Sequence, residues 1–324
     1  MFHPILIETE GVDVENKIIL SKKEKGKYKA FPTVAKTADE TIIAFREGFT
    51  DKTKPHGKDG CVKFLKSMDL KNWQEYKLPF CDNELDSIVS NVTDKQLLLI
   101  TRSYEYQKRN DVYISVFDND KIPQERGVLN IDDAEFTMFG HIIKNENELL
   151  ATAYGKHKGI DSPIILSSNN FGKNWQIKSL ITPNRHTPIL NETTITKFDN
   201  KFIAIMRSRE PSYDLYYSFS NDLMSFSKPK KTGILGHAPM IKTLKNGNLA
   251  FVFRNLNGNL PGIGLAFSKN GIDWEYSNIC NYTGNLYNGG YADFIELDDN
   301  SLFVVYYISD ESDEPWIESK IIKI

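Results

Sequence analysis

Four arginines end short apolar runs of this chain, and guanidinium groups at such places could bind an anion. The runs TIIAFR, LLLITR, FIAIMR and LAFVFR end in Arg46, Arg102, Arg207 and Arg254. A guanidinium group presents a fork of N–H donors that matches a carboxylate or a phosphate. Four arginines at equivalent places therefore predict a shared anion site. The alternative is structural ion pairing with the nearby carboxylates of Glu47, Glu105, Glu192 and Glu210.

A polar segment from Phe49 to Gly60 could carry an acid. It follows the first arginine and is about seven residues longer than the matching interval elsewhere in the chain. It contains Asp51, His56 and Asp59. A carboxyl group on a polar, glycine-bounded loop could protonate a leaving group as a general acid. We favour Asp59 over Asp51 because His56 and Gly60 frame it, and a solvated surface loop is the alternative.

A repeat of about 52 residues must position these side chains. Besides the four runs above, LLATAY ends at Tyr154 and LFVVYY at Tyr307, in the same phase. Each of the six runs follows a polar turn and an earlier apolar segment, which predicts a β-hairpin, and a third apolar segment comes next. Such a unit is typical of a propeller blade. The sequence therefore predicts an all-β fold, a single six-bladed β-propeller domain of four-stranded antiparallel blades over residues 1–324, in which the first 28 residues supply an outer strand.

Four turns after the third apolar segments share a pattern that begins with serine and ends with an aromatic residue. They span 67–73, 168–175, 220–226 and 268–274. They resemble the Asp box of the sialidase superfamily, whose members are six-bladed propeller glycoside hydrolases. We expect each to be a self-bonded Asx turn with its aromatic residue packed between blades, at the end of the blade away from the arginines.

Two further segments resemble the catalytic segments of sialidases. In Asn191–Arg207 a glutamate opens one strand and an arginine ends the next, and Gly290–Tyr307 resembles the final-blade segment that carries the tyrosine nucleophile of the family. The resemblance implies that Tyr291 is the nucleophile, Glu192 its general base and Arg207 a carboxylate clamp. It further implies that an aspartate of the polar segment is the acid/base.

The implied reaction is retaining cleavage of a terminal acidic sugar, sialic acid or a related sugar, without metal or organic cofactor. A carboxylate on the anomeric carbon would repel an anionic nucleophile, so a neutral phenol suits such a substrate. A phenol has an ordinary pKa near 10 and needs a neighbouring base, here Glu192.

The sequence also departs from the sialidase pattern. Ala30 stands where the first arginine of the clamp is expected, and Pro261 stands near the place of the third. Arg254, Arg46 and Arg102 could replace the lost contacts, with His56 and Asp51 as further substrate contacts. Two alternatives stay open: a non-catalytic glycan-binding propeller, and a propeller glycosidase of neutral sugars that uses two carboxylates, Glu192 and Asp59.

Several other residues are secondary candidates. Two histidines near the starts of first strands, His141 and His237, could contact substrate hydroxyls. Asp86 and Glu135 are alternative acids. Tyr287 and Trp316 are expected to pack rather than to stack on sugars.

Composition limits the partners. The chain has 40 Lys and Arg against 43 Asp and Glu, a formal charge of −3, and lacks a basic tract. We therefore expect an acidic glycan or oligosaccharide substrate, no nucleic acid, no membrane segment, and a monomer or weak homo-oligomer. The N-terminal sequence lacks a signal peptide pattern, so we expect a cytoplasmic protein unless another route exports it. Cys61, Cys81 and Cys280 have no metal-ligand spacing and are expected to be reduced thiols.

Overall fold

The structure is a computed structural model that describes residues 17–53, 56–79, 84–103, 111–118, 120–184, 187–209, 213–298 and 300–324. All regular elements of these residues are β-strands, numbered β1 to β23. The chain forms two compact units. Unit 1 comprises residues 1–11, 131–169 and 175–281, and unit 2 comprises 12–130, 170–174 and 282–324. A single domain over residues 1–324 stays a prediction.

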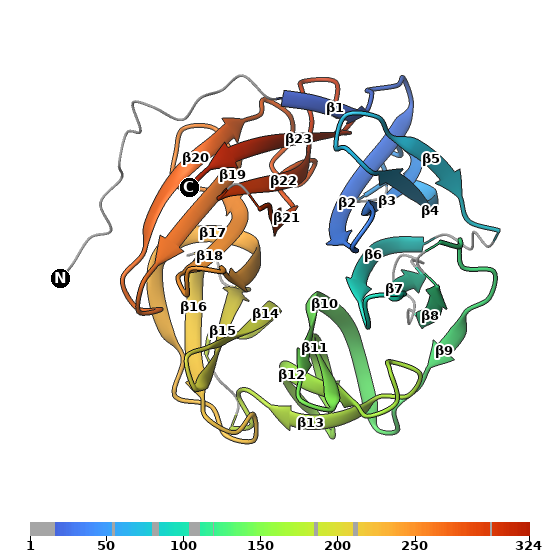
Figure 1. Ribbon diagram of the computed structural model, residues 1–324. Helices are drawn as coiled ribbons and strands as arrows, with labels where there is room; N and C mark the ends of the chain where they lie inside the picture. The colour runs from blue at the N-terminus through green and yellow to red at the C-terminus, as the bar shows by residue number, and fades with distance from the viewer. Residues whose placement is uncertain are drawn as a thin grey trace. The chain divides into compact units, whose positions relative to one another are not determined.

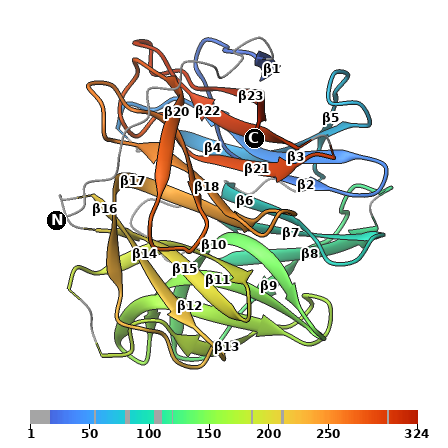
Figure 2. The ribbon, with the colours of Figure 1, turned by 60° about the vertical axis from the view of Figure 1, so that its left-hand side comes forward.

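Unit 1 holds three blades, each of four antiparallel strands. Blade 3 is β10 (Ala134–Asn145), β11 (Glu148–His157), β12 (Ile160–Ser168) and β13 (Gln176–Leu180). Blade 4 is β14 (Leu190–Phe198), β15 (Lys201–Ser208), β16 (Asp214–Ser220) and β17 (Lys230–Thr243). Blade 5 is the second part of β17 with β18 (Leu249–Asn255), β19 (Gly262–Ser268) and β20 (Glu275–Asn281). The long strand β17 thus pairs first with β16 and then with β18, and joins the two blades into one sheet (Figure 1, Figure 2).

Unit 2 holds the other three blades. Blade 1 is β2 (Lys27–Lys36), β3 (Thr41–Phe49), β4 (Lys58–Ser67) and β5 (Gln74–Lys77). Blade 2 is β6 (Glu84–Asn91), β7 (Gln96–Ser103), β8 (Val112–Asp118) and β9 (Gly127–Leu129). Blade 6 is β21 (Ala292–Glu296), β22 (Ser301–Ile308), β23 (Trp316–Lys323) and β1 (Lys17–Ser21). As predicted, an N-terminal strand, β1, is the outer strand beside β23 (Figure 1).

The six predicted hairpins and their third strands are therefore present, and the predicted fold class of six four-stranded antiparallel blades is confirmed. Within each unit, the second strands are buried where neighbouring blades pack face to face. In unit 1 Ile203 and Phe251 belong to one apolar cluster that joins blades 4 and 5. In unit 2 Phe45 and Phe303 join blades 1 and 6 in the same way.

The four serine-led turns are self-bonded, as expected. In the first, the side chain of Asp69 accepts hydrogen bonds from the backbone N–H groups of Lys71 and Asn72. The N–H bonds of Asn72 and Lys71 hold the pKa of Asp69 well below its ordinary value. The ring of Trp73 stacks on Phe303 at 5.9 Å between ring centres. The first turn therefore packs blade 1 against blade 6 within unit 2.

Four of the inner strands carry a bulge with a left-handed residue at the opposite end from these turns. The register shifts there, and the bulged residues with positive φ are Phe31 (57°), Gly140 (88°), Glu192 (22°) and Ala238 (51°). We call this end of each blade the bulge end. Bulges re-aim side chains and are frequent beside functional sites. The residue before each bulge pairs with the second strand, and in three blades its partner is Arg46, Arg207 or Arg254.

Candidate functional site

Glu192 lies in unit 1 with both carboxylate oxygens bound. The bulge of β14 turns this residue out of the regular strand register, and its side chain is buried. Oε1 accepts a hydrogen bond from Nη1 of Arg207 at 2.7 Å, and Oε2 accepts one from the backbone N–H of Ala238 at 3.1 Å. Both residues of the contact between Glu192 and Ala238 thus have positive φ. The two bulges of β14 and β17 fix the orientation of this carboxylate.

His237, the residue before Ala238 in β17, contacts Arg254. Nδ1 of His237 lies 3.0 Å from Nη1 of Arg254, and the ring of Tyr213 packs edge-on against the imidazole at 5.0 Å. A guanidinium group can only donate, so Nδ1 accepts and the imidazole is neutral. Burial of His237, followed by the charges of Arg207 and Arg254, lowers its pKa to about 2.

Burial is the larger cause of this low pKa, and the charges of Arg207 and Arg254 add a positive electrostatic potential at the bulge end of blades 4 and 5. A potential that disfavours a proton on imidazole favours an anion at the same place. Arg207 is paired with the carboxylate of Glu192, and Arg254 contacts the neutral ring of His237. The Arg207 side chain is 19% exposed and Arg254 is 1% exposed.

Tyr291 lies at the bulge end of blade 6 in unit 2. It immediately precedes β21, its side chain is half-buried, and its ring packs edge-on against Phe31 at 5.3 Å. Phe31 is the bulged residue of β2. The predicted nucleophile is therefore beside the bulge of blade 1, and its ring is also 6.1 Å from that of Tyr307.

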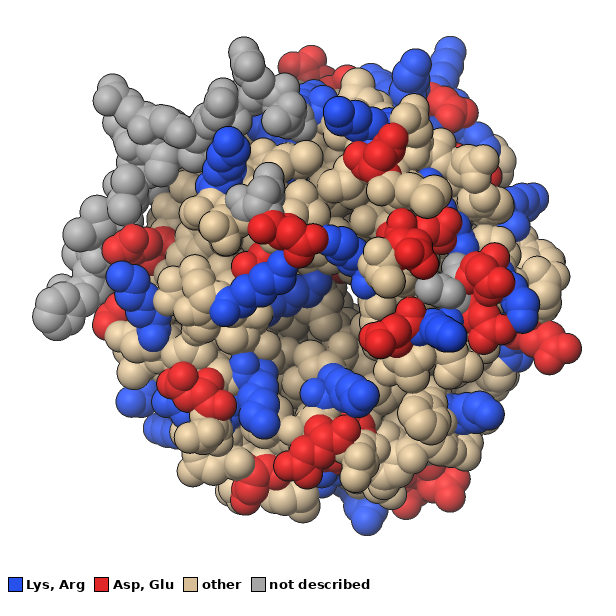
Figure 3. Space-filling model, in the orientation of Figure 1, with Lys and Arg blue, Asp and Glu red and all other residues tan. Residues whose placement is uncertain are grey.

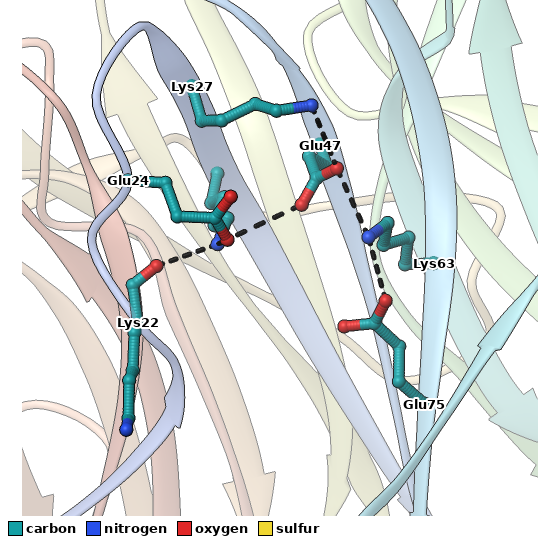
Figure 4. A network of polar contacts seen from close by, with 7 residues as sticks. Lys22, Glu24, Lys27, Glu47, Lys63 and Glu75 are labelled. Carbon is teal, nitrogen blue, oxygen red and sulfur yellow. Dashed lines mark hydrogen bonds and ion pairs between the residues drawn. The ribbon is translucent and has the colours of Figure 1, made fainter.

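Arg46 is fully buried, and its guanidinium group binds a backbone carbonyl. Its Nη1 donates to the backbone carbonyl of His56 at 2.6 Å, and its guanidinium carbon lies 5.6 Å from the centre of the Tyr28 ring. Glu47, the nearest carboxylate in sequence, binds lysines instead. Its Oε1 lies 3.1 Å from Nζ of Lys63 and 3.4 Å from Nζ of Lys27 in the network of Figure 4.

The described part of the polar segment separates its two aspartates. Oδ1 of Asp51 accepts from the N–H and the hydroxyl of Thr53, at 2.9 and 2.7 Å, so this carboxylate caps a local turn. Asp59 is exposed and left-handed, with φ of 52°. The ring of His56 packs edge-on against Phe31 at 5.2 Å. The choice of Asp59 over Asp51 as the acid stays a prediction.

The other candidate residues lie as follows in the structure. Arg102 forms an ion pair of 2.5 Å with Asp86 in blade 2, so its structural partner is a residue that the sequence offered as an alternative acid rather than one of the four glutamates. Arg207 does pair with one of the four, Glu192, whereas Glu105 and Glu210 lie outside the described residues. The remaining candidates are buried His141, exposed Glu135 and Tyr287, and partly buried Trp316, which donates to Glu318.

Within unit 1 the structure brings together Glu192, Arg207 and Arg254, and within unit 2 it brings together Tyr291, His56 and Arg46 through Phe31 and Tyr28. The sequence did not indicate the support given by His237, Ala238 or Tyr28. The available signal was their position, because each lies at or near the start of a first strand opposite an arginine-ended run.

Among the described residues, no group of three or more His, Cys, Asp and Glu side chains could hold a metal ion. The same residues include no helix long and apolar enough to cross a membrane. Lys and Arg alternate with Asp and Glu over the face seen in Figure 3. Cys61 is disulfide-bonded and Cys280 is free, so the expectation of reduced thiols is wrong for Cys61; Cys81 lies outside the described residues.

No sequence family and no curated protein matches the chain. Solved structures do match. A protein of unknown function from Dyadobacter fermentans has a TM-score of 0.82 at 17% identity, over 98% of this chain and 100% of that one. A Trypanosoma rangeli sialidase in complex with sialic acid has a TM-score of 0.74 at 13% identity, over 95% of this chain and 58% of the sialidase, so the chain spans little more than half of that enzyme.

An alpha-L-arabinanase from Penicillium chrysogenum complexed with arabinobiose also matches, with a TM-score of 0.66 at 11% identity, over 95% of this chain and 98% of that one. At such identities the likeness concerns the fold. The chain has the all-β fold of the six-bladed sialidase propellers, which glycoside hydrolases of more than one kind share.

Proposed function

We propose that the chain is a retaining exo-glycosidase that cleaves a terminal acidic sugar, sialic acid or a related sugar. The observation that carries the proposal is the pair of arginines around neutral His237 beside the buried carboxylate of Glu192. This arrangement in unit 1 provides both an anion site and a fixed base. The fold and the two sialidase-like segments support the same reading.

The residues of the chain would act in two steps. In the first, Oη of Tyr291 bonds to the anomeric carbon as Glu192 takes the phenolic proton, and Asp59 protonates the departing glycosidic oxygen. In the second, Asp59 takes a proton from water, the water oxygen bonds to the anomeric carbon on the face opposite Tyr291 as the bond to Oη of Tyr291 breaks, and Glu192 returns the proton to the phenol. Two displacements retain the anomeric configuration.

The anion site would replace the arginine that is missing at Ala30. Arg207 both orients Glu192 and retains partial exposure, so it can bind the sugar carboxylate. Arg254 adds positive charge at the same place, because the imidazole that it contacts is neutral and the guanidinium group keeps its charge. The charges of Arg207 and Arg254 favour an anionic sugar over a neutral one at this place.

Hydrolysis of an aryl α-sialoside tests the proposal. We expect turnover by the wild type, inhibition by the unsaturated sialic acid analogue, and a fall of about 10³-fold or more in kcat for Tyr291→Phe. Glu192→Gln should fall by a similar factor, and the double variant should fall little further if the two side chains act as a unit. Tyr217→Phe, a change of the same kind in the core of unit 1, is the matched control.

The arabinanase match makes a neutral-sugar glycosidase the second candidate. That enzyme type would use two carboxylates, Glu192 and Asp59, and would not need a phenol. Cleavage of an aryl arabinofuranoside that survives Tyr291→Phe but not Glu192→Gln would replace the first proposal with this one. Retention of acidic glycans on an array, with no cleavage of either substrate, would instead indicate a glycan-binding propeller.

A further inference from the structure

We propose that Tyr28 and Arg46 are positioning residues that hold the segment of the candidate acid against the segment that precedes Tyr291. Tyr28, Arg46, His56 and Asn288 form a connected set of contacts in unit 2, which we call the latch. The latch itself rests on contacts within unit 2, whereas its effect on catalysis rests on the proposed function. Arg46 then stabilises the backbone at His56 rather than binding substrate.

Arg46 holds the backbone of the latch. Its guanidinium group is fully buried, and its Nη1 donates to the carbonyl of His56, a residue with φ of 62°. Gly48 leaves the volume that this group fills, because a Cβ at Gly48 would lie 2.8 Å from Nη2 of Arg46. A buried charge-assisted bond to a carbonyl stabilises a backbone conformation that is otherwise unfavourable for a non-glycine residue.

Tyr28 joins the two segments through one hydroxyl group. The hydroxyl donates to Oδ1 of Asn288 at 3.1 Å and lies 3.2 Å from Nδ1 of His56. Since its single proton goes to Asn288, Nδ1 of His56 must carry hydrogen and donate to the Tyr28 oxygen. The hydrogen bonds therefore run from His56 through Tyr28 to Asn288, three residues before Tyr291.

Phe31 connects the same two segments by packing. Its ring contacts both the ring of His56, at 5.2 Å, and that of Tyr291, at 5.3 Å. Removal of the Tyr28 hydroxyl would therefore leave the apolar contact in place. The variant should loosen the latch without unfolding the blade.

The position of Asp59 depends on this backbone. His56, Gly57 and Asp59 have φ of 62°, 71° and 52°, so the segment turns sharply three times within four residues. Asp59 is exposed, and its carboxyl group is placed by the backbone that leads to it. A loosened latch would spread this carboxyl group over many positions and impair proton donation, while attack by Tyr291 would continue.

Tyr28→Phe tests the latch, with Tyr307→Phe as the matched control. Both tyrosines are buried in unit 2, and the Tyr307 hydroxyl donates to the carbonyl of Tyr287 at 3.2 Å, on the segment of Asn288 but away from His56. Hydrogen exchange of residues 56–60 needs no substrate. We expect it to rise at least about fivefold in Tyr28→Phe and to stay unchanged in Tyr307→Phe.

Leaving-group dependence is the catalytic readout. An alkyl glycoside of the acidic sugar needs protonation of its leaving oxygen, whereas a nitrophenyl glycoside needs little. We expect Tyr28→Phe to lower kcat for the alkyl glycoside about 10- to 100-fold and for the nitrophenyl glycoside less than about threefold, with KM unchanged.

Unchanged exchange at residues 56–60 in Tyr28→Phe would overturn the latch, and so would equal losses of kcat on the two glycosides. If the wild type cleaves no acidic glycoside, the proposed function fails, and hydrogen exchange alone then decides on the latch.

Discussion

Arg46, Arg207 and Arg254 occupy equivalent places in their blades, yet their guanidinium groups bind different partners. The carbonyl of His56 holds the first, the carboxylate of Glu192 the second and the ring of His237 the third. The residue opposite each arginine differs as well, being alanine in blade 1, asparagine in blade 4 and histidine in blade 5. One repeated position thus has a backbone carbonyl as partner in blade 1, a carboxylate in blade 4 and an imidazole in blade 5.

His237 should make the folded state sensitive to acid. Its pKa is about 2 when folded against an ordinary value of 6.5, so between these values the unfolded chain binds a proton that the folded chain does not. Stability due to this group is therefore present above pH 6.5 and is lost as the pH falls, by about 2 kcal/mol between pH 7 and pH 5. Urea unfolding at pH 7, 6 and 5 measures it, and His237→Gln should show a shallower decline.

The comparison with His237→Gln isolates the titration because glutamine also offers an oxygen that can accept from Arg254. Parallel declines of the free energy of unfolding in the two proteins would show that His237 titrates normally.

At the scale of elements, the bulges of the inner strands position the site. Ala238 has φ of 51°, and its N–H donates to Glu192. A left-handed conformation costs alanine about 1 kcal/mol more than glycine. We therefore expect Ala238→Gly to leave thermal stability unchanged or to raise it.

Ala204→Gly is the matched control, because Ala204 is equally buried in the regular part of β15. There glycine should cost about 1 kcal/mol through chain entropy and lost apolar contact. Equal losses of free energy of unfolding at the two positions would contradict the role of the bulge.

The sequence predicts the strands well and the bulges not at all. Apolar runs between polar turns locate all six hairpins, because burial on both faces demands continuous apolar segments. Register across the hairpin is set by pairing, which local sequence does not express. In blade 3 the sequence places Tyr154 in phase with the arginines, each of which pairs with the residue before a bulge. The residue before the bulge of this blade, Phe139, pairs with Thr152 instead. Tyr154 lies two residues further along β11.

At the scale of the whole molecule, strand β1 links the two ends of the described chain. It pairs with β23, with Lys17 opposite Lys320 and Ile18 opposite Ser319. Without β1, the N–H and C=O groups of β23 would form an open edge that invites pairing between molecules. Deletion of residues 1–21 should therefore lower the melting temperature and promote aggregation relative to deletion of residues 1–16.

The difference between these two deletions isolates β1, since the shorter one retains it. Melting curves and light scattering at the same protein concentration provide the measurement. Coincident melting curves and equal scattering would show that the β23 edge needs no cover.

The candidate site was predictable in its residue types but not in its contacts. Glu192 and Tyr291 were found through segments that resemble those of sialidases, and the arginines through their phase in the repeat. Sequence gives no sign that Arg46 reaches a backbone carbonyl ten residues away or that His237 is neutral. Those features arise from burial and from long-range packing in each unit.

Covalent trapping tests the central claim most directly. A fluorinated analogue of the acidic sugar with a good leaving group should form the glycosyl-enzyme faster than water can release it, because fluorine beside the reacting carbon slows hydrolysis of the intermediate. Peptide mass spectrometry after incubation should then find one sugar on the peptide that contains Tyr291, and none in Tyr291→Phe. A sugar on Glu192 or another carboxylate, or no adduct at all on the folded wild type, would contradict the account.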